Sequence, residues 1–478
     1  MDKGQAIPEG GSLCYKREII HELIERLGKE NVITGREDML CYSYDATPDV
    51  PDPLPDVVVT PESTGQVSQV IQVAQRHKIP LYPRGSGTNL SGGTVPLKGG
   101  IVMSMLKMAD ILEIDAENLT ATVQPGVIIQ DLNNAVSPHG LLYPPDPGTV
   151  TTATMGGSVA ECSGGLRGLK YGVTKHYVMG LEVVLADGQV ARFGGKTVKN
   201  VTALDMVKLF TGSEGTLGII TEIIVRLIPA PEARKTMFAT FSDLSDAGNA
   251  VTGIVKNKVI PATLEIMDQV TIKTVENYAK IGLPTEARAI LLIEVDGIPE
   301  VVEREADTVM EVIKNNNGSI RMARDDKERD DLWAARRAAL PALAQVKPTT
   351  VLEDATVPRS KITEMLLALE EIAQKYNLQI GTFGHAGDGN LHPTILTDER
   401  DKEEMERVHA AVKDIFEKAL ALGGTLSGEH GIGMAKSGFL EWELGKSGVD
   451  VLQKIKKALD PEGILNPGKM GFNRGARK

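Results

Sequence analysis

Three tracts of small residues constrain the fold of this chain more than any other feature. They run from Gly85 to Gly93, from Thr151 to Gly165 and from Gly212 to Gly218. The first follows a predicted strand, the third leads into one, and the second is too polar for a core and too regular for a linker. Because glycine lets the main chain approach a ligand closely, three such tracts predict a domain that holds one long ligand.

The first tract excludes a Rossmann NAD site. A dinucleotide fingerprint needs its third glycine at position 90, where a helix begins; this chain has Leu90, and residues 91–96 cannot start a helix. Consecutive small residues can instead wrap their amide groups around a pyrophosphate, and Ser86, Thr88 and Ser91 would add hydroxyl donors. The alternative is a flexible surface loop. The two further tracts favour a ligand-binding role, and a dinucleotide such as FAD fits it.

Hydrophobic periodicity divides the chain into two parts at Pro229-Ala230-Pro231. Before this point we predict a helix over 16–30, a linker over 48–56, a βαβ unit over 57–82, and strands over 101–105, 120–124, 181–185 and 219–227. After it, strands over 235–241 and 289–295 alternate with helices over 244–256, 301–315, 361–376 and 401–422. This pattern predicts an α+β arrangement.

Composition narrows the function. A chain of 478 residues holds more than one domain, and its net charge of -12 argues against nucleic acid or an anionic membrane as partner. No apolar run approaches the ~20 residues of a membrane span, and the polar residues 1–11 lack a signal core. We therefore expect a cytoplasmic protein. The three scattered cysteines form no iron–sulfur ligand set.

Three of the eight histidines lie in two glycine-rich strings, 384–392 and 427–431. His385 and His392 would face opposite sides of one straight strand, but the turn-forming residues between them can bring both imidazoles together. With Glu429 they would form a metal site of two histidines and a carboxylate, open to a substrate, and Zn, Mn and Fe all suit it. The alternative is that these histidines cap or bridge loops.

The chain resembles the FAD-linked oxidase family of the vanillyl-alcohol oxidase / p-cresol methylhydroxylase superfold. The resemblance rests on six motifs in order: PRGSGTNLSGG (83–93), PPDPGTVTTATMGGSVAE (144–161), GSEGTLGI (212–219), GHAGDGNLH (384–392), SGEHGIG (427–433) and LNPGK (465–469). It is closest to the D-2-hydroxyacid dehydrogenase branch, which includes D-lactate dehydrogenase, the glycolate oxidase D subunit and D-2-hydroxyglutarate dehydrogenase. It covers roughly residues 40–470.

The resemblance implies an α+β fold in which a two-part FAD-binding domain precedes an α+β cap domain with an antiparallel sheet. The expected divisions are an N-terminal helical segment and linker (1–54), the FAD-binding domain (55–230), the cap or substrate domain (231–420) and a C-terminal segment that returns to the flavin site (421–478).

The resemblance also implies the residues that bind FAD. The first loop holds no histidine for a covalent link, so we expect noncovalent FAD. The expected cofactor-binding residues are Pro83, Arg84, Gly85, Ser86, Gly87, Thr88, Asn89, Ser91, Gly92, Asp146, Thr149, Gly156, Gly157, Ser158, Ala160, Ser163, Gly164, Glu214, Gly218, Ile220 and Asn466.

The implied reaction is oxidation of a small D-2-hydroxyacid to the 2-oxoacid by hydride transfer to flavin N5. A metal held by His385, His392 and Glu429 would lower the pKa of the substrate hydroxyl, and His430, free to point away from the metal, would take its proton. Arg336 would bind the carboxylate through paired hydrogen bonds. The alternative for its segment, a solvated face with i,i+4 ion pairs, is disfavoured because Asp330 and Asp331 precede alanines at that spacing.

Dicarboxylate-using relatives carry a lysine where this chain has the apolar Leu352. We therefore favour D-lactate, then glycolate, over 2-hydroxyglutarate. Electrons would leave through a partner protein, such as an electron-transfer flavoprotein or a separate iron–sulfur subunit, or through a quinone or cytochrome. The open alternatives are a flavoprotein subunit of a multi-subunit glycolate oxidase, a D-2-hydroxyglutarate dehydrogenase, and a metal hydrolase with an incidental glycine-rich domain.

Overall fold

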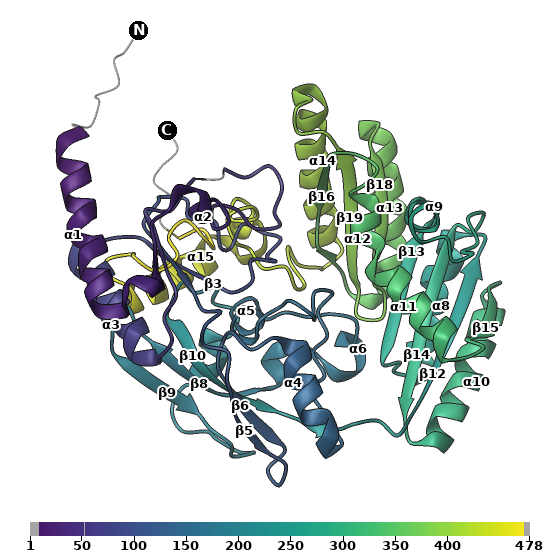
Figure 1. The fold of residues 1–478 in the computed structure, drawn as a ribbon. Coiled ribbons are helices and arrows are strands. Elements are labelled where there is room, and N and C mark those ends of the chain that lie inside the picture. Colours follow the sequence, from purple (N-terminus) through teal and green to yellow (C-terminus); the bar gives the residue numbers. More distant parts are fainter. Residues whose placement is uncertain (1–8, 52, 473–478) are drawn as a thin grey trace.

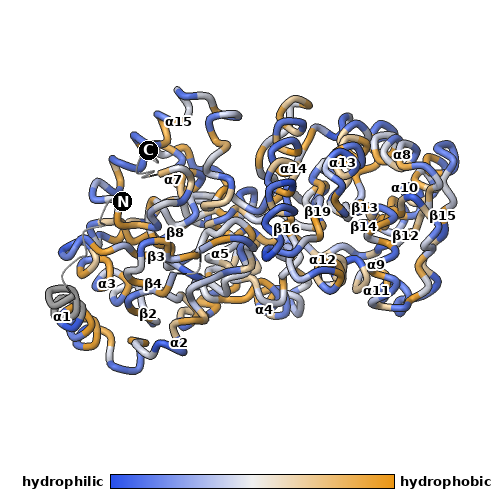
Figure 2. Tube along the Cα trace, turned by 90° about the horizontal axis from the view of Figure 1, so that it is seen from above, coloured by the Kyte–Doolittle hydropathy of each residue, from blue (hydrophilic) through white to orange (hydrophobic). Residues whose placement is uncertain are grey.

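The computed structural model describes residues 9–51 and 53–472, which form two parts lying side by side (Figure 1). Viewed from above, apolar segments gather inside each part and hydrophilic turns lie outside (Figure 2). Among the described residues, no helix combines the length and the apolar character needed to cross a membrane.

A four-stranded sheet opens the N-terminal part. Its order is β1-β2-β4-β3, formed by Val32–Ile33, Val57–Val59, Ile101–Ser104 and Leu81–Arg84. The predicted βαβ unit is present, but β4 lies between its two strands and is parallel to both. Helices α1 (Glu9–Leu27) and α3 (Thr64–His77) share an apolar core with this sheet, and α2 (Arg36–Leu40) lies in the connection to β2. Strand β3 ends where the first glycine tract begins.

A second, antiparallel sheet completes the N-terminal part. Its order is β5-β6-β10-β8-β9, formed by Ile111–Asp115, Thr120–Val123, Ile219–Arg226, Val178–Val184 and Val190–Gly194. Its core includes residues of helices α4 (Ile129–Val136), α5 (Met155–Glu161) and α7 (Met206–Phe210). Helix α5 lies inside the second small-residue tract, where we predicted no helix. Thr154 caps it by accepting a hydrogen bond from the Gly157 amide.

An eight-stranded antiparallel sheet forms the second part, so the predicted α+β class with an antiparallel cap sheet is confirmed. A short pair, β7 (Leu141–Leu142) with β11 (Ile228–Pro229), precedes it. The order is β15-β12-β14-β13-β18-β19-β16 with β17 beside β19, formed by Ser319–Met322, Ala233–Phe241, Ala289–Gly297, Thr263–Asp268, Gln379–His385, Asn390–Thr397, Thr349–Leu352 and Ala355–Thr356.

Helices cover both faces of this sheet. Alternate strand residues belong to two separate apolar cores, as the two-residue period of a strand requires. On one face the core includes α8 (Leu244–Lys256), α10 (Pro299–Asn315), α13 (Ile362–Tyr376) and α14 (Lys402–Ala421). On the other it includes α9 (Gln269–Ala279), α11 (Asp326–Arg337) and α12 (Ala339–Leu343).

The C-terminal segment returns to the N-terminal part, as Figure 1 shows for α15 (Leu440–Leu459). The Leu81 amide donates to the Ile464 carbonyl, and the Asn466 amide donates to the Leu81 carbonyl. The buried Lys469 ammonium donates to the carbonyls of Gly92 and Val95. Residues 464–469 therefore hold strand β3 and the first glycine tract in place. Helix α6 (Gly168–Tyr171) and the 3-10 turns Lys29–Asn31, Ser137–His139, Thr174–His176 and Arg359–Lys361 complete the fold.

Asp268 joins helix α9 to the strand that ends at His385. One carboxylate oxygen accepts the Thr271 amide at 2.8 Å and the other accepts the Thr382 amide at 2.8 Å. We expect Asp268→Ala to lower the free energy of unfolding by roughly 1–3 kcal/mol, because it removes a helix cap and leaves the amide of the buried Thr382 unpaired. Asp243→Ala, which removes the exposed cap of α8, should cost about 1 kcal/mol or less. Urea unfolding of both variants checks this; equal losses would contradict the second role of Asp268.

Candidate functional site

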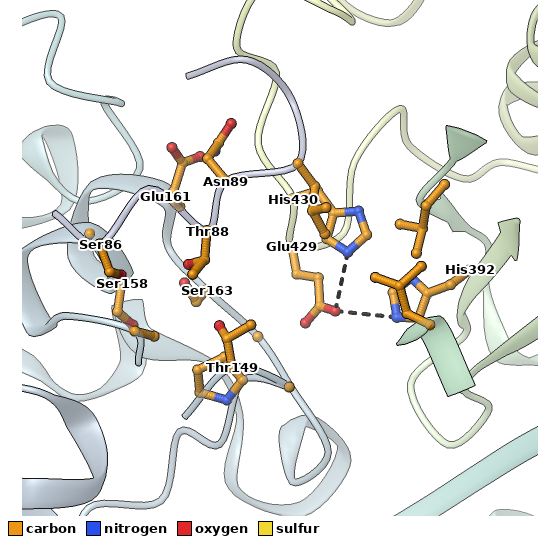
Figure 3. A pocket seen from close by; sticks show the side chains of 18 of the residues that line it. Ser86, Thr88, Asn89, Thr149, Ser158, Glu161, Ser163, His392, Glu429 and His430 are labelled. Atoms are coloured by element: carbon orange, nitrogen blue, oxygen red, sulfur yellow. Dashed lines mark ion pairs between the residues drawn. The ribbon is translucent and has the colours of Figure 1, made fainter. Parts of the chain in front are cut away.

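A cavity of about 340 Å³ lies between the two parts of the molecule. The first two glycine tracts form one wall, and side chains of the cap and of the string 427–431 form the other (Figure 3). A smaller cavity of about 70 Å³ adjoins it and ends against the third tract. Both are lined by Gly85, Thr94, Thr154, Gly157 and Glu161. All three tracts therefore meet along one continuous space, which suits a long ligand.

Most of the residues expected to bind a cofactor line this space. The larger cavity is bordered by Gly85, Ser86, Gly87, Thr88, Asn89, Thr149, Gly157, Ser158, Ser163 and Gly164. The smaller is bordered by Pro83, Arg84, Gly85, Gly156, Gly157, Ala160, Glu214, Gly218, Ile220 and Asn466.

Ser91, Gly92 and Asp146 line neither cavity. The buried Ser91 hydroxyl lies 3.0 and 2.9 Å from the carbonyls of His430 and Gly431, and Gly92 offers its carbonyl to Lys469. Asp146 contacts Arg337 at 3.4 Å. The structure thus places these three residues behind the walls, where they fix the loops.

Arg84 supports the first tract with its side chain and does not direct it into the cavity. Its guanidinium donates to the carbonyls of Tyr44 and Cys41 at 2.7 and 3.3 Å and to the Thr94 hydroxyl at 3.0 Å. A Cβ at Gly87, whose φ is 75°, would collide with this guanidinium. The cation therefore packs behind the loop whose small side chains and amides line the cavity.

Gly157 is the position where a side chain would fill the cavity with least harm to the fold. It lies in helix α5, lines both cavities, and a Cβ there would meet only the Thr154 hydroxyl, at 3.1 Å. We expect Gly157→Leu to fold and to weaken binding of a dinucleotide by about 10–100-fold, since overpacking typically costs ~1–3 kcal/mol. Cofactor content after gel filtration measures this, with Gly65→Ala on α3 as the control. Full occupancy in Gly157→Leu would place the ligand elsewhere.

The hairpin of β18 and β19 brings His385 and His392 to one face of the cap sheet. His385 pairs with Asn390 and Phe383 pairs with His392 in the strand register, so the two histidines are diagonal neighbours. Their ring centroids lie 5.1 Å apart. Gly389 supports the turn with a φ of 91°.

Glu429 lies between the two imidazoles. Its Oε1 is 3.2 Å from His385 Nε2 and 3.3 Å from His392 Nε2. Three atoms each ~2.1 Å from one ion lie about 3.0–3.4 Å apart in tetrahedral or octahedral sites. Two histidines and one carboxylate are also a donor set that leaves positions open for a substrate. These residues therefore fit a divalent cation.

The charges at this site also favour a cation. His385 Nδ1 pairs with Glu265 Oε1 at 2.8 Å, so a neutral His385 donates there and turns an Nε2 lone pair toward the Glu429 carboxylate. Burial opposes the charge of His385 and the charge of Glu429. Nevertheless, the carboxylates of Glu265 and Glu429 raise the pKa of His385 well above its ordinary value, and His385 lowers that of Glu429 well below it. Without a proton or an ion between them, His385 Nε2 and Glu429 Oε1 would face each other as two acceptors. Either a proton or a metal ion at Nε2 removes this unfavourable contact.

His430 also lies beside the Glu429 carboxylate. Its ring stacks on His392 with centroids 4.9 Å apart and an interplanar angle of 15°, and its Nε2 is 3.7 Å from Glu429 Oε1 (Figure 3). Burial lowers the pKa of His430 to about 4. The ring is therefore neutral at neutral pH and able to accept a proton.

Asp354 fixes the string that carries Glu429 and His430. Its Oδ2 accepts the Ser427 hydroxyl at 2.6 Å and the Glu429 and His430 amides at 3.0 Å. Burial disfavours the charge of Asp354, whereas these three donors and the Lys436 ammonium, 3.6 Å from Oδ2, favour it. Asp354, His392 and His430 also converge closely enough to hold an ion, so the predicted ligand set has a geometric alternative among the described residues.

Arg336 lines the larger cavity but is already paired. Its Nη2 and Nε lie 2.5 and 2.8 Å from Glu265 Oε2, and the guanidinium stacks over Phe383 at 4.8 Å. Helix α11 does carry i,i+4 pairs, contrary to our expectation: Lys327 bonds Asp331 at 3.0 Å. The expectation considered only acids that precede bases, whereas here the base precedes the acid. The pairs lie on the exposed face, and Arg336 is buried.

Sequence reasoning missed two glutamates, the buried Glu265 and the half-buried Glu161. Glu265 contacts both Arg336 and His385, and Glu161 lines both cavities. Burial and the neighbouring Glu214 raise the pKa of Glu161 well above its ordinary value. Glu161 stood inside a recognised motif and could have been singled out as an acid among small residues. Glu265 lies in an ordinary strand and gave no signal.

Apolar side chains line the cavity beside these charges: Leu340, Pro341, Leu352 and Phe383 of the cap, and Leu166 of the N-terminal part. The space next to the histidines therefore has Arg336 and the candidate metal ligands at one end, with apolar side chains around them.

Two family models match the chain: an FAD binding domain over residues 55–194 and the C-terminal domain of FAD linked oxidases over residues 230–470. The chain is 53% identical over 463 residues to a glycolate oxidase subunit GlcD of Bacillus subtilis, covering 97% of this chain and 98% of that one. It is 34% identical to a D-lactate dehydrogenase of Anaerostipes hadrus, covering 95% and 98%.

Solved structures share the fold at low sequence identity. Substrate-bound p-cresol methylhydroxylase superposes with a TM-score of 0.81 at 20% identity, covering 99% of this chain and 100% of that one. The 4-ethylphenol oxidase of Gulosibacter chungangensis superposes with a TM-score of 0.77 at 20% identity, covering 98% and 99%.

Proposed function

The chain belongs to the FAD-linked oxidases, and we propose that it oxidises a small D-2-hydroxyacid, D-lactate first and glycolate next, to the 2-oxoacid. One observation carries the proposal: a single cavity has the glycine tracts on one side and His385, His392, Glu429, His430 and Arg336 on the other. The first side suits a flavin and the second suits a hydroxyl and a carboxylate. The named reactions of the two relatives, glycolate oxidase and D-lactate dehydrogenase, involve such substrates.

The chain's own residues would prepare the substrate for hydride transfer. Noncovalent FAD along the tracts would accept the hydride at N5, and a divalent cation (Zn, Mn or Fe) held by His385, His392 and Glu429 would acidify the substrate hydroxyl. The neutral His430 ring takes the hydroxyl proton. The substrate thus loses a hydride from its α-carbon and a proton from its hydroxyl, which is a balanced two-electron oxidation.

Arg336 would hold the substrate carboxylate. Nε and Nη2 on the side edge of its guanidinium contact the same Glu265 oxygen, whereas Nη1 makes no bond to Glu265, so the end edge keeps the N–H groups of Nη1 and the second N–H of Nη2. A planar guanidinium can bind a carboxylate through two parallel hydrogen bonds. Arg336 therefore keeps donors for a ligand while its charge is balanced by Glu265.

The apolar wall favours a short substrate. Leu352 is 9% exposed and borders the cavity with Leu340. A second carboxylate placed against these side chains would lose its hydration without gaining a partner, which costs several kcal/mol. This argues for D-lactate or glycolate over 2-hydroxyglutarate.

The electrons would then pass to a partner protein, such as an electron-transfer flavoprotein or an iron–sulfur subunit. The chain has three cysteines, too few for the four thiolates of an ordinary iron–sulfur cluster. A second candidate, the flavoprotein subunit of a multi-subunit glycolate oxidase, is favoured by the similarity to GlcD, which is named as a glycolate oxidase subunit.

Anaerobic reduction of the bound flavin tests the proposed reaction. The substrates are D-lactate, L-lactate, glycolate and D-2-hydroxyglutarate, and bleaching of the flavin absorbance reports each rate. We expect D-lactate and glycolate to bleach the flavin fastest. Faster bleaching by D-2-hydroxyglutarate would overturn the substrate assignment, and no bleaching by any of them would overturn the reaction.

A further inference from the structure

Glu265 lies directly between the two groups that would bind the substrate. It is 1% exposed, and each of its carboxylate oxygens contacts a different group. Oε1 is 2.8 Å from Nδ1 of His385, and Oε2 is 2.5 Å from Nη2 of Arg336. The Glu265 carboxylate therefore joins His385, a candidate metal ligand, to Arg336, the candidate group for binding the substrate carboxylate.

The cap sheet fixes this arrangement from several sides. Ile266 on β13 pairs with Gly384 on β18, so the next step of the same register places Glu265 opposite His385. Helix α11 lies on the same face of the sheet and lays Arg336 over Phe383. A charge held by two strands and a helix has little freedom to reorient, so a shift at one end of the carboxylate is transmitted to the other.

A metal ion bound at His385 would also affect Arg336, because both side chains contact the Glu265 carboxylate. A cation at Nε2 of His385 makes Nδ1–H a stronger donor and tightens its bond to Oε1. The tightened bond holds Glu265, and hence the paired edge of Arg336, in one position. The end edge of Arg336, formed by Nη1 and Nη2, is then already oriented for a carboxylate, which lowers the entropy cost of binding it.

We propose that Glu265 is a positioning residue that couples metal binding at His385, His392 and Glu429 to carboxylate binding at Arg336. The inference rests on the proposed function, because it assumes that metal site and that carboxylate site. Coupling between two binding sites is reciprocal, so the metal should strengthen carboxylate binding and the carboxylate should strengthen metal binding by the same factor.

The test measures binding to the flavin-loaded full chain, without turnover. Propionate is the carboxylate probe, because it lacks the hydroxyl that would chelate the metal directly, and the perturbed flavin absorbance reports its affinity. Mn²⁺ is the metal probe, and the electron paramagnetic resonance signal of the free ion reports its affinity. Propionate affinity is measured with and without saturating Mn²⁺ in the native protein and in Glu265→Gln.

In the native protein we expect Mn²⁺ to tighten propionate binding by about 5-fold or more, within the usual range of coupling. Glu265→Gln should bind Mn²⁺ about 10–100-fold more weakly, as changes behind a metal-bound histidine do, and should reduce the coupling to less than about 2-fold. The matched control is Glu294→Gln: Glu294 is a buried glutamate of the neighbouring strand that contacts Trp333 and Thr236 and lies outside the cavity. It should leave both values unchanged.

The outcomes separate this inference from the proposed function. Native coupling that persists in Glu265→Gln overturns the role of Glu265 and leaves the proposed reaction standing. A native protein that binds no Mn²⁺ overturns the metal site and this inference with it. Should Glu265→Gln fail to fold, Glu265→Asp replaces it: the charge is kept, but the side chain is one carbon too short to reach both partners, so the coupling should again be lost.

Discussion

Replacing His430 with alanine is expected to leave FAD bound and to slow its reduction by D-lactate by about 10²–10⁴-fold, the usual contribution of a general base. The ring is buried, lies 3.7 Å from the Glu429 carboxylate, and has no hydrogen-bond partner at Nδ1 within the described part of the chain. Its main-chain amide, which would persist in the variant, keeps the bond to Asp354. The loop should therefore survive while the proton acceptor is lost.

Anaerobic stopped-flow bleaching of the flavin measures this rate, and flavin content confirms that the cofactor remains. His409→Ala is the control, because that histidine lies exposed on α14 and pairs with Asp49. A lowered histidine pKa keeps the neutral form of His430 available down to about pH 4, so protonation of His430 itself should not slow the native reaction until the pH drops to about that value. Unchanged bleaching in His430→Ala would remove His430 from the reaction.

Replacing Glu429 with glutamine is expected to lower both metal content and flavin reduction, the latter by about 10²-fold or more. The carboxylate is the shared contact of His385 and His392, and a neutral amide cannot offset the charge of a divalent ion. Loss of metal stabilisation worth several kcal/mol corresponds to this factor. The variant should keep FAD, because glutamine has nearly the same size and shape as glutamate and the glycine tracts are unchanged.

Metal analysis of the purified variant and flavin bleaching by D-lactate check this expectation together. Glu353→Gln offers a control next to Asp354, since Glu353 does not line the cavity. If Glu429→Gln kept its metal and lost only the rate, the ion would sit at the alternative cluster of Asp354, His392 and His430.

Regular elements could be predicted from the sequence where one apolar face sets the period. Helix 244–256 was predicted with the bounds that the structure has, because Asp243 caps it and its apolar residues repeat at helical spacing. Helix α5 was not predicted, because its two glycines and small polar residues show no such period. It forms because Thr154 caps it and because its own residues Met155 and Val159 are buried in the core of the N-terminal part.

The candidate site, too, could be predicted only in part from the sequence. The sequence predicts that three side chains lie close together, those of His385, His392 and Glu429. It does so because turn residues separate the two histidines and a carboxylate follows in a second motif. The contact of His385 with Glu265 could not be predicted, since that pairing depends on which strand lies beside β18. Likewise the sequence placed Arg84, Ser91 and Asp146 at the cofactor, whereas the structure turns the Arg84 side chain, Ser91 and Asp146 toward the loops behind it.

The central claim is that the flavin side and the histidine side of one cavity act together on a 2-hydroxyacid. The most direct test is the anaerobic rate of flavin bleaching by D-lactate in the protein as purified, after chelation, and after Zn²⁺, Mn²⁺ or Fe²⁺ is restored. We predict rapid bleaching at first, slowing by about 10²-fold on metal removal, and recovery with at least one of the three ions. Bleaching at an undiminished rate in metal-free, flavin-loaded protein would contradict this account.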